Sequence, residues 1–211
     1  MTSPRTTERS GEVQEALYAI IDLEVAEAPI ALAEQALEAG CAWLQLRAKK
    51  ADDRTWLQVA LALRERCTRA RTPFVVNDRA DIARIVGADG LHLGQDDLRI
   101  GDARLVVGDM KIGVSTHSLD QALEADAEGA DLIAFGPVFG TTTKENPDPT
   151  VGLEKLAEVC RSVRRPVVAI GGIAPQNASE TLDAGASYIA VISALPLFVE
   201  AAAAQRASSK Y

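Results

Sequence analysis

The sequence contains few of the residues that mark several other classes of protein. Aromatic residues make up 4% of the 211 residues, and the three cysteines lie far apart. An odd number of widely spaced cysteines favours neither a disulfide framework nor a cysteine metal site, and it suits a reducing cytosol. No apolar run reaches the roughly 18 residues of a transmembrane helix, and the polar N-terminal stretch has no signal-peptide core. We therefore expect a cytoplasmic protein without a membrane partner.

A surplus of positive charge is also missing. The chain has 22 Lys and Arg residues against 30 Asp and Glu residues, giving a net charge of -8 and a pI near 4.9. Domains that bind nucleic acid are usually basic, so we expect no nucleic-acid partner. A local cationic pocket could still bind a phosphate ligand. The hydrophobic content of 47% is typical of a globular protein, and the length fits one large domain or two small ones.

Short apolar runs alternate with helical patterns along the chain. The apolar runs occupy residues 17–22, 42–47, 73–78, 90–95, 111–116, 131–136, 166–172 and 187–193. Two of the intervening helical patterns end at Gly40 and Gly129, as expected for C-cap glycines. Repeated strand–helix units form parallel sheets, and eight of them predict an α/β fold of the (β/α)8 barrel type. An open doubly wound sheet is the alternative, but the first strand lacks its glycine-rich fingerprint.

We expect this barrel to form a single domain over residues 15–206. Flexible tails are expected at residues 1–14 and 207–211.

Polar side chains gather at the carboxyl ends of the second and third predicted strands. Alternate residues of a strand face the same side, so Gln45 and Arg47 point into the barrel and Lys49 continues their spacing. A solvated surface cluster is the alternative for this stretch. Asn77 and Asp78 end the third predicted strand, where either could instead cap the next helix.

The fourth predicted strand is followed by Asp96 and Asp97. These two residues could be the first-turn acids of a helix. In a barrel, however, Asp78 and one of this pair face the same mouth from neighbouring strands. Two carboxylates beside a substrate phosphate are a common way to hold Mg2+. The sequence therefore predicts a metal–diphosphate site and leaves the choice between Asp96 and Asp97 open.

Other candidate residues are less informative by themselves. His92 alternates with leucines on a buried strand and is interpreted as structural, while His117 lies beside a helix start. Gly171 and Gly172 end the seventh strand, and Ile192 and Ser193 end the eighth. The loops after these strands usually cradle phosphate in such barrels, although the glycines could form an ordinary turn.

Taken together, these motifs resemble the thiamine phosphate synthase family. The matching segments cover nearly all of the predicted barrel, in the expected order: QLRAK, FVVNDRADIA, ADGLHLGQDDL, IGVSTHS, ADLIAFGPVF with TTTK, PVVAIGGI and GASYIAVISAL. The resemblance implies a barrel enzyme that joins a pyrimidine diphosphate to a thiazole phosphate. The implied products are thiamine phosphate and pyrophosphate, and the implied route passes through a pyrimidine carbocation.

The resemblance also assigns roles to individual positions. It implies Mg2+ as the cofactor, with Asp78 and Asp97 as its ligands. The implied catalytic residues are Lys144, Arg47 and Ser115. The pyrimidine diphosphate would contact Gln45, Arg47, Lys49, Asn77, Ser115 and Lys144. The thiazole phosphate would contact Thr141, Thr143, Gly172, Ile192 and Ser193.

Some features differ from the family pattern. Ala48 replaces a usual glutamate, but it should face away from the ligands, and Gly140 replaces a usual proline. The long polar segment that follows the sixth strand, residues 140–150, is expected to act as a lid touching both substrates. A related thiazole tautomerase would lack the diphosphate-binding set, and a non-catalytic precursor-binding protein would have no use for it. The sequence is compatible with a homo-oligomer.

Overall fold

A computed structural model describes residues 13–141 and 149–208. Its strands close into a barrel in the order β1 to β8, with every neighbouring pair parallel. The strands are β1 (Leu17–Asp22), β2 (Trp43–Arg47), β3 (Phe74–Asn77), β4 (Gly90–Leu93), β5 (Lys111–Thr116), β6 (Leu132–Phe135), β7 (Val167–Ile170) and β8 (Tyr188–Val191). Each lies within an apolar run of the sequence, so the predicted (β/α)8 barrel is confirmed.

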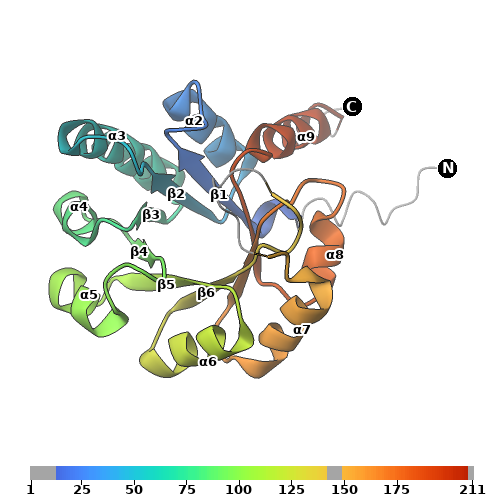
Figure 1. Cartoon of the computed structure of the whole chain (residues 1–211). Helices are drawn as coiled ribbons and strands as arrows, with labels where there is room; N and C mark the ends of the chain where they lie inside the picture. The colour runs from blue at the N-terminus through green and yellow to red at the C-terminus, as the bar shows by residue number, and fades with distance from the viewer. Residues whose placement is uncertain (1–12, 142–148, 209–211) are drawn as a thin grey trace.

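A helix follows every strand, and the helices surround the barrel (Figure 1). The helices are α2 (Pro29–Ala39), α3 (Asp53–Ala70), α4 (Ala80–Val86), α5 (Ile100–Val107), α6 (Leu119–Glu128), α7 (Gly152–Ser162), α8 (Ala178–Asp183) and α9 (Leu195–Ser208). The predicted C-cap glycines, Gly40 and Gly129, both adopt the left-handed conformation. In the described part of the chain, no helix is both long and apolar enough to cross a membrane.

The expected tails lie mostly outside the described residues. At the start of the described part of the chain, residues 13–15 are helical, and Gln14 donates a hydrogen bond to the carbonyl of Phe198 at 3.3 Å.

One apolar cluster lies on the outside of the barrel wall and a second lies on the inside. Leu44 and Leu46 belong to the larger cluster, which lies between the strands and the helices. Burying such a leucine contributes about 1.5–3 kcal/mol. Tyr18, Val75 and Leu132 belong to the smaller cluster. Because side chains alternate along a strand, Gln45 then faces inward between its two leucines, as predicted.

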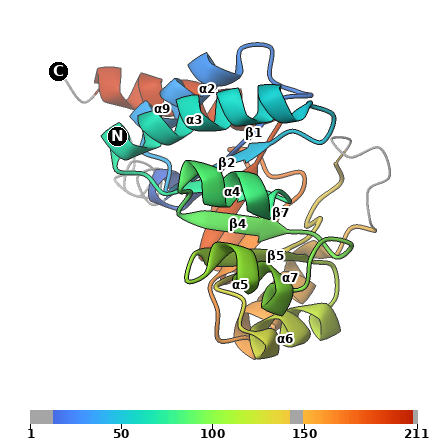
Figure 2. The ribbon, with the colours of Figure 1, turned by 90° about the vertical axis from the view of Figure 1, so that its left-hand side faces the viewer.

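Two aspartates link neighbouring strands at the end of the barrel where the strands begin. Asp89 precedes β4 and accepts hydrogen bonds from the Phe74 amide of β3 (2.8 Å) and from Arg64 of α3 (2.6 Å). Asp131 precedes β6 and accepts from the Ile112 amide of β5 (2.9 Å) and from Arg104 of α5 (2.8 Å). Each carboxylate therefore joins a helix and two strands. Figure 2 shows β4 and β5 side by side in the barrel wall.

Replacing Asp131 with asparagine should destabilise the barrel. Partial burial acts to raise the pKa of Asp131, but the bonds from Ile112, Arg104 and Lys111 hold it below its usual value. Stability from such a carboxylate is present above the unfolded-state pKa of about 3.9 and is lost as the pH falls through the lower folded-state value. We expect Asp131→Asn to lower the free energy of unfolding by about 1–2 kcal/mol at pH 7. The difference should shrink in strong acid.

Urea unfolding of both proteins as a function of pH measures this effect. The control is Asp109→Asn, which removes an exposed carboxylate. Equal stability of Asp131→Asn and the unchanged chain at pH 7 would contradict the role of the carboxylate.

Candidate functional site

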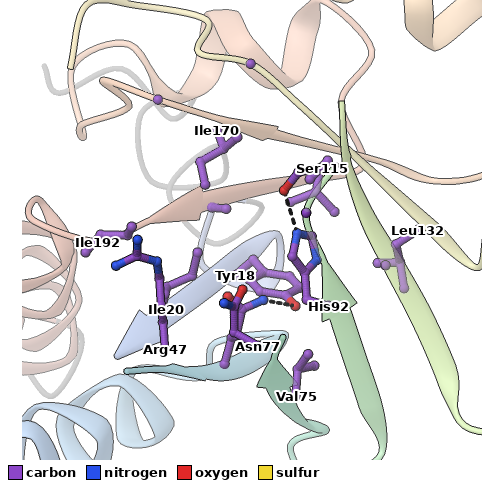
Figure 3. Close-up of a pocket in the computed structure, with 18 of the residues that line it drawn as sticks. Tyr18, Ile20, Arg47, Val75, Asn77, His92, Ser115, Leu132, Ile170 and Ile192 are labelled. Atoms are coloured by element: carbon purple, nitrogen blue, oxygen red, sulfur yellow. Dashed lines mark hydrogen bonds between the residues drawn. The ribbon is translucent and has the colours of Figure 1, made fainter. Parts of the chain in front are cut away.

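A cavity of about 680 Å³ opens where the carboxyl ends of the strands meet. Figure 3 shows side chains from several strands converging on it. Eleven predicted site residues line this cavity: Gln45, Arg47, Lys49, Asn77, Asp78, Asp97, Ser115, Thr141, Gly172, Ile192 and Ser193. The other two, Thr143 and Lys144, lie outside the described residues, as does most of the expected lid. Residues from distant segments therefore share one site.

The inward face of β2 is anchored to β1. The side-chain amide of Gln45 donates a hydrogen bond to the Tyr18 hydroxyl at 3.0 Å, within the barrel. Burial raises the pKa of Tyr18 well above its usual value, so this phenol stays neutral. Further up the strand, Arg47 forms an ion pair with Asp22. A surface cluster is thus the wrong interpretation for Arg47, whose side chain is only 17% exposed.

Asp22 is a site-associated residue that the sequence reasoning missed. It is the last residue of β1 and is 1% exposed. An aspartate at the end of a buried strand was the available signal, because such a charge normally needs a partner. That partner could be identified only from the pairing of β1 with β2, which places Asp22 opposite Arg47.

The backbone of Asp78 adopts an uncommon conformation that turns the chain after β3. Its φ of 63° is in the left-handed region, which few residues other than glycine adopt. Helix α4 has Arg79 at its N-cap and no side-chain capping bond, so the capping alternative for Asn77 and Asp78 is wrong. The Lys49 ammonium lies 3.6 Å from the Asp78 carboxylate. Lys49 is half-exposed, so this ion pair borders solvent.

Asp78 and Asp97 bring two carboxyl groups into contact. Burial, a hydrogen bond with Asp97 and repulsion from its charge raise the pKa of Asp78 to about 6, although Lys49 acts to lower it. Two acids that repel each other in this way favour a shared proton or a cation between them. The pair therefore fits a cation better than it fits two free negative charges.

Asp97 is held in place by the turn after β4. Its Oδ2 accepts a hydrogen bond from the Gly94 amide at 2.6 Å. Because α5 begins only at Ile100, Asp96 and Asp97 are not first-turn acids of that helix, and this alternative is wrong. Among the described residues, no group of three or more His, Cys, Asp or Glu side chains could hold a metal ion. A cation at Asp78 and Asp97 would thus need further oxygen ligands from water or substrate.

Ser115 is linked to a histidine inside the barrel. The Nε2 atom of His92 and the Ser115 hydroxyl are 2.8 Å apart (Figure 3). A Cβ at Gly113 would lie 2.8 Å from Nδ1 of His92, so this glycine makes room for the ring. The Ser115 carbonyl also accepts from Gln95 at 2.6 Å. His92, interpreted as structural from sequence, therefore lies in the cavity wall and helps to orient a predicted catalytic residue.

Glycine is required at the two positions after β7 because a larger side chain would not fit there, a reason that the sequence did not indicate. A Cβ at Gly171 would lie 2.4 Å from the Cβ of Pro137, and one at Gly172 would lie 2.4 Å from the Gly140 carbonyl. The Phe139 amide donates to the Gly171 carbonyl at 3.0 Å. The glycines thus let the chain after β6 pack against the end of β7. This packing positions the start of the polar loop, including Thr141, at the cavity.

Other sequence interpretations can be placed directly. Ala48 is buried in the outer apolar cluster, so it faces away from the cavity as predicted. Cys41 is also buried, and burial raises the pKa of its thiol to about 12, consistent with a core residue. His117 precedes α6 and contacts the Gly136 carbonyl through Nδ1 at 2.6 Å.

Comparison with known proteins gives a consistent result. Residues 17–195 match the family described as thiamine monophosphate synthase. Curated relatives named thiamine-phosphate synthase include one from Chloroflexus aurantiacus, 42% identical, covering 90% of this chain and 89% of its own length. Another, from Methanocella arvoryzae, is 46% identical and covers 83% of each chain.

A solved structure is similar as well. The thiamine phosphate pyrophosphorylase from Pyrococcus furiosus superposes with a TM-score of 0.78 at 35% identity, covering 90% of this chain and 98% of that one. The family match over residues 17–195 includes all eight strands of the barrel. The chain therefore belongs to the thiamine monophosphate synthase family.

Proposed function

We propose that the barrel mouth joins a pyrimidine diphosphate to a thiazole phosphate by a dissociative substitution. The chain is an enzyme of thiamine biosynthesis, with the thiamine-phosphate synthase activity of its family. The substrates are 4-amino-2-methyl-5-hydroxymethylpyrimidine diphosphate and 4-methyl-5-(2-phosphoethyl)thiazole. The observation that carries the proposal is that Arg47, Lys49 and the acid pair Asp78–Asp97 line one cavity.

The first step breaks the bond between the pyrimidine methylene carbon and the diphosphate oxygen. The electron pair leaves with pyrophosphate, and the methylene carbon is left as a cation stabilised by the pyrimidine ring. Arg47 and Lys49 would bind the leaving group and offset its growing charge, as would Lys144. Fixed charges stabilise such a transition state because they need no reorganisation during the reaction.

The second step forms a bond from the thiazole nitrogen to the methylene carbon. The nitrogen supplies its lone pair, so no proton has to be removed and no general base is required. Apolar side chains of the cavity wall, including Ile20, Leu132 and Ile170, would limit the access of water to the cation. Ser115, oriented by His92, would contact the pyrimidine.

Asp78 and Asp97 are proposed to hold Mg2+ together with oxygen atoms of the diphosphate. Bound there, Mg2+ would neutralise negative charge on the departing pyrophosphate. The close contact of the two carboxyl groups supports this assignment, since a cation between them removes their repulsion. The ion pair with Asp78 also holds Lys49 at the same part of the mouth.

The thiazole phosphate is proposed to bind on the late-strand side of the mouth. Thr141, Gly172, Ile192 and Ser193 line the cavity there, and Thr143 is assigned with them from the sequence. Backbone amides near a glycine can approach a phosphate closely. The partners we propose are thus small molecules rather than nucleic acid or a membrane, and a homo-oligomer stays an expectation. The free thiols of Cys41, Cys67 and Cys160 support a cytoplasmic location.

The proposed reaction predicts that the purified chain forms thiamine phosphate from the two precursors in the presence of Mg2+. Pyrophosphate should appear in equal amount, because each coupling releases one molecule. Chromatography of the products, together with a coupled pyrophosphate assay, measures both. Absence of thiamine phosphate with a folded protein, as judged by circular dichroism, would contradict the proposed function.

The metal assignment predicts that Asp78→Asn weakens the response to Mg2+. Asparagine also tolerates the left-handed backbone, so the fold should remain. We expect kcat/KM to fall about a hundredfold, as when one charge-stabilising group is lost, and the Mg2+ concentration for half-maximal activity to rise. Asp96→Asn, which removes an adjacent carboxylate, is the matched control. An unchanged Mg2+ response in Asp78→Asn would refute this ligand.

The leaving-group assignment predicts that Lys144→Ala slows the chemical step by roughly a hundredfold or more. The physical reason is that the variant loses one positive charge that would stabilise the departing pyrophosphate. Single-turnover measurement of product formation separates this step from substrate binding. Lys155→Ala removes an exposed lysine of α7 and serves as the control. Equal single-turnover rates for Lys144→Ala and the unchanged chain would exclude the role.

A further inference from the structure

Asp22 is a buried carboxylate beside the cavity to which the proposed reaction assigns no role. Its Oδ2 pairs with Nη1 of Arg47, and its Oδ1 accepts a hydrogen bond from the Glu24 amide at 3.0 Å. With 1% exposure, it has almost no access to solvent. A buried charge that loses its partner is strongly unfavourable, so Asp22 and Arg47 each depend on the other.

The position of Asp22 indicates that it acts through Arg47. Arg47 lines the main cavity, as do Ile20 and Ile192 (Figure 3). Asp22 is not among the described residues that line this cavity. It lines a smaller neighbouring cavity of about 380 Å³ instead. A ligand in the main cavity would therefore meet the guanidinium of Arg47, with the carboxylate of Asp22 on its far side.

Lys49, the other positively charged residue near the end of β2, is held less firmly than Arg47. Lys49 is 52% exposed and lies 3.6 Å from Asp78, whose carboxyl group is also in contact with Asp97. The ion pair of Lys49 can thus be exchanged for one with a ligand. The ion pair of Arg47 is buried, and among the described residues Arg47 is the one charged side chain that is hydrogen-bonded to Asp22. Arg47 is therefore fixed before a ligand arrives.

We propose that Asp22 is a positioning residue that orients Arg47 for the diphosphate of the substrate. A guanidinium has five N–H donors in a rigid plane. Engaging Nη1 with Asp22 fixes that plane and leaves other donors for phosphate oxygens. The proposal rests on the proposed function, in which Arg47 binds the diphosphate, and it adds the residue that makes this arginine preorganised.

The sign of the effect distinguishes positioning from simple charge. Removing a negative charge next to an anion site should strengthen anion binding by Coulomb attraction alone. Positioning has the opposite effect, because Arg47 without its partner moves among several orientations. Asp22→Asn is suited to this question, since its remaining carbonyl oxygen can still accept the Glu24 amide and preserve the turn.

The test is calorimetric binding of inorganic pyrophosphate with Mg2+ to the whole chain. We expect Asp22→Asn to weaken binding about ten- to a hundredfold, in the range caused by misplacing one contact group. In steady-state assays, the KM for the pyrimidine diphosphate should change more than the KM for the thiazole phosphate. Glu24→Gln is the matched control, because it neutralises a carboxylate two residues away that does not line either cavity.

A double-mutant cycle separates positioning from a general structural effect. In an Arg47→Gln background, adding Asp22→Asn should change pyrophosphate binding by less than about twofold, because the group to be positioned is gone. If the two substitutions instead weaken pyrophosphate binding independently, so that their fold-changes multiply in the double variant, the proposal is overturned. Unchanged or tighter binding by Asp22→Asn alone would also overturn it. If Asp22→Asn does not fold, Asp22→Glu keeps the charge and displaces the guanidinium, and unchanged binding by that variant would likewise overturn the proposal.

The proposed function and the positioning role of Asp22 can be contradicted separately. An unchanged chain that binds pyrophosphate but forms no thiamine phosphate would contradict the proposed function, while the cycle could still support positioning. An active chain with multiplying effects would contradict only the role of Asp22. No measurable binding of pyrophosphate by the unchanged chain would contradict both.

Discussion

Closure of the parallel sheet is the constraint on which the site depends. Since β1 pairs with both β2 and β8, all eight strands end at one mouth. Residues distant in sequence, such as Arg47 and Ser193, thereby line one cavity. The apolar clusters on the two sides of the sheet stabilise this closure. The cavity chemistry is supplied by side chains just past the last apolar residues, where the strands no longer need apolar packing.

Much of this arrangement could be predicted from sequence because it depends on local periodicity. The alternation in WLQLR determines that Leu44 and Leu46 pack against helices while Gln45 points into the barrel. The alternation of strands and helices likewise limits the architecture to a few folds. The choice of Asp97 over Asp96 is different, because it comes from the family resemblance. The spacing leaves both residues open, and both line the cavity.

The features that escaped prediction depend on contacts between distant segments. The partner of Asp22 is identified by the register of β1 with β2, which a single sequence does not reveal. The requirement for glycine at position 171 arises from Pro137, which packs against it from another loop. His92 is hydrogen-bonded, as a structural histidine should be, but it also lines the cavity, because a strand in a barrel has one face directed inward. Periodicity identifies that face but not the hydroxyl group of Ser115 opposite it.

The charged side chains at the barrel mouth are arranged in two ways. Arg47 is held by the buried carboxylate of Asp22, whereas burial and interaction with Asp97 raise the pKa of Asp78 to about 6. The most direct test is a crystal structure of the protein with pyrophosphate and Mn2+, located by its anomalous scattering. We expect one Mn2+ bound by Asp78, Asp97 and pyrophosphate oxygens, with Arg47 contacting the same pyrophosphate while still paired with Asp22. Mn2+ bound away from these two carboxylates would contradict the proposed metal site.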